Sequence, residues 1–119
     1  MSTLSFSQTG GFSSYIDQIF IDIDLDKKSI SVRTAWDGTP RTSTLEAADL
    51  AWINTAIQKT ILPSAGSVYR CKQCADQFIY ELTLKSATAT HKLHWEDGSN
   101  APAALNELRE KMVRLASKY

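Results

Sequence analysis

The sequence has little that would give the protein a strong electric field. Lysine and arginine together number 13, aspartate and glutamate also number 13, and the formal net charge is zero. A balanced chain does not attract DNA, RNA or an anionic membrane over long distances. The sequence therefore predicts neither a nucleic-acid partner nor a membrane partner.

Targeting and membrane-spanning segments are missing as well. The first residues, Met1 to Phe6, lack the basic start and the apolar stretch of a secretory signal. No apolar run approaches the roughly 20 residues that a membrane-spanning helix needs. On these grounds we expect a cytoplasmic protein.

Common catalytic and ion-binding motifs are also lacking. The sequence contains no P-loop, no dinucleotide-binding fingerprint and no nucleophile elbow. Asp22, Asp24 and Asp26 alternate with apolar residues at strand spacing and no glycine follows, so we interpret them as a polar strand face and not as a calcium loop. These absences together favour a binding protein over an enzyme, with no cofactor and no metal of its own.

The length and composition are those of an ordinary globular domain. The chain has 119 residues, of which 43% are hydrophobic and 22% charged. This length is sufficient for one domain with a real hydrophobic core. We therefore predict a single domain over residues 1–119.

Alternating apolar residues predict five strands. Apolar side chains recur at every second position, which is typical of strands with one buried face. The predicted strands cover residues 4–8, 19–25, 30–36, 78–84 and 89–95.

Two segments predict helices. Ser43 and Glu46 fit a capping box, and apolar residues then recur at helical spacing as far as Ile57. The second helix starts near Pro102 and has one apolar stripe. Short turns between successive strands favour antiparallel pairing. The sequence thus predicts an α+β fold: an antiparallel sheet of four to five strands with two helices packed on one face, in the order βββαββα.

Residues 63–75 form the longest predicted loop, which contains Cys71 and Cys74. A thioredoxin-like redox pair would need the first cysteine at the start of a helix, and here a strand follows. A zinc site would need two further ligands, and His91 and His94 are three positions apart on a strand and therefore face opposite sides. The remaining interpretation is two loop cysteines, free or joined in a small local disulfide. We expect His91 to be partly buried and His94 to be solvated.

Three segments of the chain resemble a known family. They are Phe6–Phe12 (FSQTGGF), Ala75–Leu82 (ADQFIYEL) and Asp97–Leu105 (DGSNAPAAL). In order and spacing they are similar to emfourin-like proteins, small bacterial inhibitors of protealysin-like metalloproteases of the thermolysin family. The extra strand near Ile30 and the Cys71/Cys74 loop depart from shorter relatives. The resemblance implies a reversible inhibitor, and a thermolysin-family zinc protease as its partner.

The predicted hairpin suggests which residues would meet such a protease. An antiparallel hairpin brings the loop before Asp76 close to the loop after Glu96. Val68 and Tyr69 then offer apolar side chains beside the carboxylate of Asp97. A carboxylate can occupy the open position of a catalytic zinc. The alternative interpretation of Asp97 is a turn or cap residue, and that of Val68 and Tyr69 is packing onto the core.

Other assignments remain open at this point. A second possible contact pair is Asp37 with Phe12, in turns at the ends of the first three strands. The rival functions are a small metal- or redox-active domain that uses Cys71 and Cys74, and an adaptor without inhibitory activity. We expect the protein to be a monomer.

Overall fold

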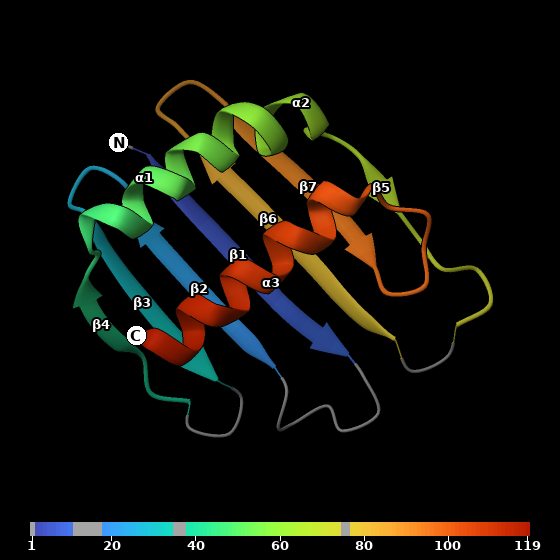
Figure 1. The fold of residues 1–119 in the computed structure, drawn as a ribbon, viewed down its shortest axis with the longest axis horizontal. Helices are drawn as coiled ribbons and strands as arrows, with labels where there is room; N and C mark the ends of the chain where they lie inside the picture. Colours follow the sequence, from blue (N-terminus) through green and yellow to red (C-terminus); the bar gives the residue numbers. More distant parts are fainter. Residues whose placement is uncertain (1, 11–17, 35–37, 75–76) are drawn as a thin grey trace.

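Seven strands form one sheet in the computed structural model, which describes residues 2–10, 18–34, 38–74 and 77–119 (Figure 1). The strand order across the sheet is β4-β3-β2-β1-β6-β7-β5. The strands are β1 (Thr3–Gly10), β2 (Ile19–Asp24), β3 (Ser29–Thr34), β4 (Arg41–Thr44), β5 (Val68–Tyr69), β6 (Phe78–Lys85) and β7 (Thr90–Glu96).

Antiparallel pairing holds for every neighbouring pair of strands except β5 and β7, which run parallel. The centre of the sheet is β1, where Phe6 lies opposite Ile21 of β2 and Leu82 of β6. The first four strands form a meander, and β6 and β7 form a hairpin. The pairing of β1 with β6 joins these two halves.

Two long helical segments cover one face of the sheet (Figure 1). The first consists of α1 (Ala47–Ala56), the π-helical turn η1 (Ile57–Ile61) and α2 (Leu62–Ser64). The second is α3 (Ala103–Lys118). These findings confirm the α+β class and the placement of two helical segments on one face of the sheet.

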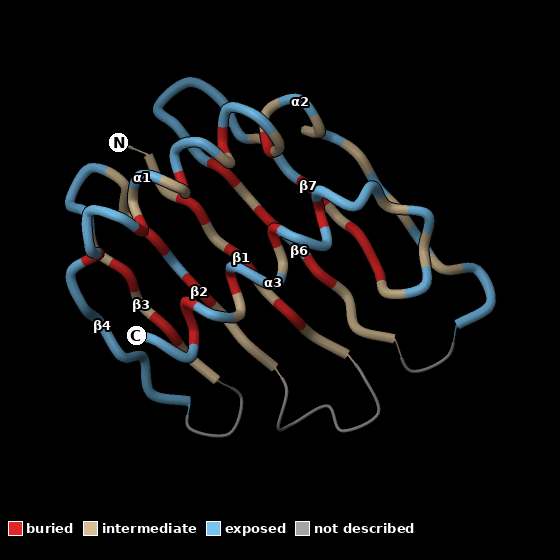
Figure 2. Tube along the Cα trace, in the orientation of Figure 1, coloured by how far each residue is buried: buried red, intermediate tan, exposed pale blue. Residues whose placement is uncertain are grey.

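The hydrophobic core lies between the helices and the sheet. Alternate strand residues are buried, as the red segments of Figure 2 show, because every second side chain of a strand points to the same face. Val32, Ile61, Trp95 and Met112 are fully buried there. Phe6, Tyr80 and Trp95 pack together, with ring centroids 5.5 to 6.4 Å apart. The other face of the sheet carries polar residues such as Ser5 and Asp22, whose side chains are hydrogen-bonded to each other.

The sheet is larger than the four to five strands predicted, and it is not wholly antiparallel. The two unpredicted strands lie at its edges. In β4 all four residues are exposed and none is apolar, so the sequence has no alternating pattern that would predict this strand. In β5 only two residues pair.

The predicted capping box is wrong. Ser43 lies within β4, opposite Ile30. Glu46 occupies the N-cap position of α1, and its side chain makes no capping hydrogen bond. The chain thus pairs with β3 for four residues before it turns into the helix.

Among the described residues, no helix is long and apolar enough to cross a membrane.

Candidate functional site at the disulfide corner

The end of β7 and the segment that contains the two cysteines lie side by side at one corner of the sheet. We call residues 68–74 and 94–99 the disulfide corner. Val68 pairs with His94, and Tyr69 pairs with Trp95. The His94 N–H also donates a hydrogen bond to the carbonyl of Ser67 at 3.1 Å. The two loops that the hairpin argument placed together are therefore adjacent.

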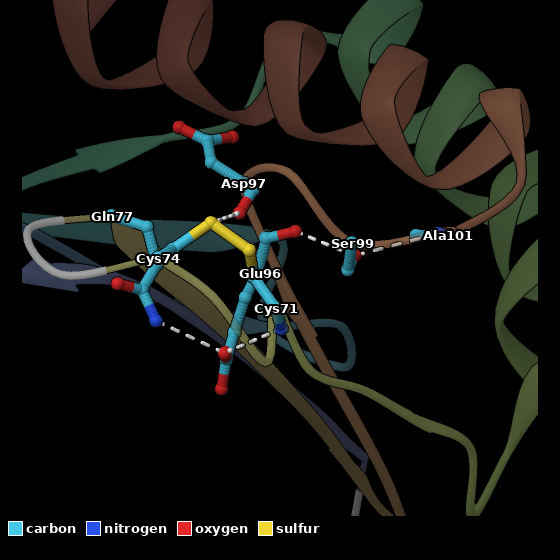
Figure 3. Close-up of a disulfide and its surroundings, with 7 residues drawn as sticks. All are labelled: Cys71, Cys74, Gln77, Glu96, Asp97, Ser99 and Ala101. Atoms are coloured by element: carbon cyan, nitrogen blue, oxygen red, sulfur yellow. Dashed lines mark hydrogen bonds between the residues drawn. A yellow bond between two sulfur atoms is a disulfide. The ribbon is translucent and has the colours of Figure 1, made fainter.

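Cys71 and Cys74 form a disulfide at this corner, with their Cα atoms 5.5 Å apart (Figure 3). The structure thus has the local disulfide, one of the alternatives left open by the sequence. The Sγ of Cys74 lies 3.6 Å from the carbonyl oxygen of Asp97. At Gly98 the backbone has a positive φ of 78°, and a Cβ there would lie 2.8 Å from the Sγ of Cys74. Only glycine fits here, because the disulfide packs directly on the turn after β7.

Glu96 is the buried charge of the corner, with 6% of its surface exposed. Its Oε1 accepts hydrogen bonds from the backbone N–H of Cys71 at 3.1 Å and from the Nε2 of Gln77 at 3.2 Å. Its Oε2 lies 2.7 Å from the Nε2 of His94 and 3.8 Å from the guanidinium of Arg70. The hydrogen bonds from His94 and from the Cys71 backbone outweigh burial and lower the pKa of Glu96 to about 2.

His94 connects this carboxylate to the open face of the sheet. Its Nδ1 lies 3.5 Å from Glu81 on β6, and its Nε2 contacts Glu96. Only 19% of its side chain is exposed, so the expectation of a solvated histidine is wrong. The loop from Gly66 to Cys74 covers this end of β7. The alternation of apolar and polar residues along β7 could not predict that contact.

Asp97 points away from Glu96, toward the helix side of the sheet (Figure 3). Its Oδ1 accepts a 2.9 Å hydrogen bond from the hydroxyl of Tyr80. Burial and this hydrogen bond raise the pKa of Tyr80 above its ordinary value, so the hydroxyl stays protonated and donates. The backbone N–H of Asp97 bonds to Phe78 at 3.1 Å and fixes the main chain. Asp97 is half-buried, and its Oδ2 has no hydrogen-bond partner within the described part of the chain.

Val68 and Tyr69 occupy different faces of the corner. Val68 is 54% exposed, and it is the one large apolar side chain exposed among the described residues. It borders a 260 Å³ depression on the open face of the sheet, together with Glu81 and Lys92. Tyr69 packs against the core. The structure therefore places Val68 and Asp97 at the same corner but on opposite faces, and Tyr69 on the core side.

Two predicted contact residues, Phe12 and Asp37, lie outside the described residues. Their suggested pairing therefore stays a prediction. In the described ranges no group of three or more histidine, cysteine, aspartate or glutamate residues is arranged to hold a metal ion.

A second buried carboxylate lies near the opposite edge of the sheet. Asp49 of α1 is 9% exposed. Its Oδ2 accepts hydrogen bonds from the Nζ of Lys118 at 2.8 Å and the hydroxyl of Tyr119 at 2.6 Å. Its Oδ1 accepts one from the indole of Trp52 at 3.2 Å. Burial alone would raise the pKa of Asp49, but these three hydrogen bonds outweigh it and the pKa is lowered. This network fastens the end of α3 to the start of α1.

A groove of about 530 Å³ lies between α1 with η1 on one side and α3 on the other. Its ionic lining residues, Lys59, Glu107 and Lys111, are all exposed. Functional sites more often contain buried ionisable groups with perturbed pKa values than exposed ionic side chains such as those of the groove. The corner contains such a group, Glu96. It also contains the exposed Val68 and the carboxylate of Asp97, one oxygen of which has no hydrogen-bond partner in the described part of the chain. We therefore take the corner as the candidate site.

A comparison with family models, with curated proteins and with solved structures found no match. The fold and the corner define a mixed α+β protein that displays a disulfide-closed loop at one end of an open sheet face. The likeness to emfourin-like proteins stays a resemblance of three sequence segments.

Proposed function

We propose that this protein is a reversible inhibitor of a thermolysin-family, protealysin-like zinc metalloprotease, and that it acts through the disulfide corner. The observation that carries the proposal is the position of Asp97. Tyr80 holds one carboxylate oxygen, and the second oxygen has no partner within the described chain. A fixed carboxylate with one free oxygen suits a metal ion held by another protein.

The inhibitory step requires no chemistry by this chain. A thermolysin-type zinc keeps one coordination position open for water or substrate. The Oδ2 of Asp97 would occupy that position and displace the water that the protease activates. Because a side chain and not a peptide carbonyl meets the zinc, no scissile bond lies in attack geometry. The inhibitor therefore dissociates intact.

Rigidity of the corner supports tight binding. The disulfide, the Glu96 hydrogen bonds and the turn bond from Ser99 N–H to the Glu96 carbonyl at 3.2 Å order this region before any partner arrives. A preorganised loop loses less conformational entropy on binding.

The exposed side chain of Val68 supplies an apolar contact at the corner, on the face opposite to Asp97. Burial of a valine side chain contributes about 1.5 kcal/mol or more to association. Tyr69 is a second apolar candidate, on the core side of β5. In this proposal the protein is a cytoplasmic monomer that is not an enzyme, holds no cofactor and binds one protease molecule.

The experiment is a titration of a protealysin-like protease with this protein, followed by cleavage of a short peptide substrate. Activity is expected to fall to zero near one equivalent of inhibitor, and mass spectrometry should find the inhibitor intact. Full protease activity at a large excess of inhibitor would contradict the proposal and favour an adaptor.

Asp97→Ala tests the zinc contact. We expect the variant to weaken inhibition by roughly 100-fold, which is the loss of one strong anchor of about 3 kcal/mol. The matched control is Asp97→Asn, which keeps an acceptor for Tyr80 and removes only the charge. Weak inhibition by both variants, with unchanged circular dichroism, would support a role of the charge. If both inhibit like the wild type, Asp97 is not the anchor, and Asp37→Ala is the next variant.

A further inference from the structure

The disulfide is the covalent cross-link of the corner, and its two cysteines differ in exposure. Cys74 is exposed and Cys71 is half-buried. Exposed disulfides are the ones that exchange with external thiols, and attack occurs at the sulfur that the thiol can reach. The neighbours of Cys74 on the chain, Lys72 and Gln73, are exposed as well.

The disulfide closes a very short loop, with a sequence separation of 3. A crosslink over so few residues restricts the unfolded chain only slightly and adds little to the stability of the whole fold. The disulfide takes no part in the sheet or in the hydrophobic core between β1 and α3. Its structural effect is therefore local to the corner.

Locally, the disulfide determines how the cysteine segment fits against the turn after β7. A Cβ at Gly98 would lie 2.8 Å from one sulfur and 3.1 Å from the other, so on this side the turn lies directly against both sulfurs. Two separate thiols need more space than one S–S bond, because non-bonded sulfurs stand at van der Waals distance. In the disulfide form, the Cys71 N–H is held by the Oε1 of Glu96 at 3.1 Å, so any movement of the segment away from the turn would lengthen or break this hydrogen bond.

We propose that the Cys71–Cys74 disulfide is a thiol–disulfide exchange site for a dithiol reductant, and that its reduction releases residues 70–74 from the turn at residues 96–99. The effect on protease inhibition rests on the function proposed above, whereas the exchange itself does not. In a reducing compartment the thiol form would dominate, and the reverse exchange, with an external disulfide as the oxidant, would assemble the corner.

The exchange is balanced. A thiolate of the reductant attacks the Sγ of Cys74, the S–S bond breaks, and its electron pair leaves on the Sγ of Cys71, which takes up a proton. The second thiol of the reductant, as its thiolate, then attacks the reductant sulfur of the mixed disulfide and releases the Cys74 thiolate. Two electrons pass from the dithiol to the protein, and the dithiol leaves as its own disulfide.

Two single variants test which sulfur is reached. Cys71→Ser leaves the exposed Cys74 thiol, and Cys74→Ser leaves the half-buried Cys71 thiol. We expect iodoacetamide to alkylate the remaining thiol about 10-fold faster in Cys71→Ser than in Cys74→Ser, since reactivity follows exposure. Equal rates or the reverse order would overturn the assignment of Cys74 as the attacked sulfur.

Amide hydrogen exchange tests the release of the segment. After reduction with dithiothreitol, the amide of Cys71, which donates to Glu96 in the disulfide form, is expected to exchange about 10-fold faster, while β1 and β6 keep their protection. The double variant Cys71→Ser/Cys74→Ser should show the fast exchange without any reductant and no response to it. Unchanged protection at the corner, or reduction only in unfolded protein, would overturn the proposal.

Inhibition assays separate this proposal from the proposed function. The reductant is removed first, because a dithiol would itself bind the zinc of the protease. Oxidised protein that inhibits about 10-fold more strongly than the double serine variant supports the switch. Equal inhibition by both forms overturns control by the disulfide and leaves the inhibitor function standing. If neither form inhibits while corner exchange responds to reduction, the inhibitor function fails and the exchange site stands.

Discussion

Asp49 and Glu96 are the two buried acidic residues of the described chain, and they are stabilised in different ways. Asp49 accepts hydrogen bonds from Lys118 and Tyr119, about 70 positions away in sequence, and thereby ties α1 to α3. Its cation, Lys118, is 44% exposed and also reaches Glu46 at 2.9 Å.

Glu96 depends instead on a histidine, an amide side chain and one backbone N–H, with the Arg70 guanidinium farther off at 3.8 Å. Water can reach the hydrogen bonds of Asp49 because Lys118 is exposed, and it can replace a hydrogen bond that is lost there. It cannot easily do so at Glu96, under the disulfide segment. We call the hydrogen bonds of Asp49 with Lys118 and Tyr119 the helix tie. The comparison predicts that substitutions at the helix tie lower the free energy of unfolding less than substitutions at the disulfide corner do.

The largest effect is expected for Glu96→Ala. The substitution removes the buried acceptor of three half-buried residues, which are Cys71, Gln77 and His94. We expect a loss of about 3 kcal/mol in the free energy of unfolding, measured by urea denaturation at neutral pH. The control is Glu81→Ala, which removes the exposed partner of His94 and should cost less than about 0.5 kcal/mol. Similar losses for both variants would show that burial does not distinguish the two glutamates.

The second prediction concerns acid. The pKa of Glu96 falls from its ordinary 4.5 in the unfolded chain to about 2 in the fold. A lowered carboxylate pKa stabilises the fold above the unfolded value, and that stability is lost as the pH falls from about 5 toward 2. The loss attributable to Glu96 is about 3 kcal/mol, at about 1.4 kcal/mol per pKa unit.

Glu96→Gln should therefore flatten the acid side of the stability curve. Asp49 acts in the same direction, since its pKa is lowered too, so a smaller acid dependence should remain in the variant. Urea denaturation at several pH values between 2 and 7 measures it. An acid dependence equal to that of the wild type would exclude Glu96 as its main source.

A smaller effect is expected at the helix tie. Asp49→Ala removes the acceptor of Lys118, Tyr119 and Trp52, but water can reach the lysine. We expect a loss of about 2 kcal/mol in thermal or urea unfolding. Glu46→Ala, the exposed partner of the same lysine, is the control, with an expected loss below about 0.5 kcal/mol. A loss at Asp49 larger than at Glu96 would reverse the comparison.

The smallest predicted effect is that of Tyr80→Phe. The ring stays packed against Phe6 and Trp95, and only the hydroxyl donor to Asp97 is lost. The free energy of unfolding should fall by about 1 kcal/mol. Tyr69→Phe is the matched control, because the Tyr69 hydroxyl has no hydrogen-bond partner inside the described ranges. Its expected effect is below about 0.5 kcal/mol. A large loss in both variants would point to packing and not to the hydrogen bond.

Much of the fold follows from the sequence because its strongest signals are periodic. Strands β1, β2, β3, β6 and β7 alternate apolar and polar residues, and α3 has one apolar stripe. Strand β4 reads Arg-Thr-Ser-Thr, which shows no alternation of burial. Its serine and the following Glu46 imitate a helix start, and only the pairing of Ser43 with Ile30 decides between the two structures.

The corner was predictable in position but not in chemistry. Antiparallel pairing of β6 and β7 placed the cysteine loop beside Asp97, and the structure confirms that the two segments are neighbours. The role of Glu96 was missed, because a glutamate at the end of an amphipathic strand is usually solvated. What buries it is a loop more than 20 residues upstream, and no local pattern records that contact.

The order of strands also has a consequence for how the chain reaches its native state. The first four strands are a meander within residues 3–44, which can pair as they emerge from the ribosome. Part of their helix-facing side, however, stays bare until α3 is synthesised, because α1 and η1 cover only the other part. The central β1–β6 pairing joins Thr3 to Lys85, so the sheet is completed only across a long stretch of chain. Such non-local closure slows folding and leaves an apolar sheet face exposed in the meantime. A chain cut before α3 should therefore aggregate, even with every strand present.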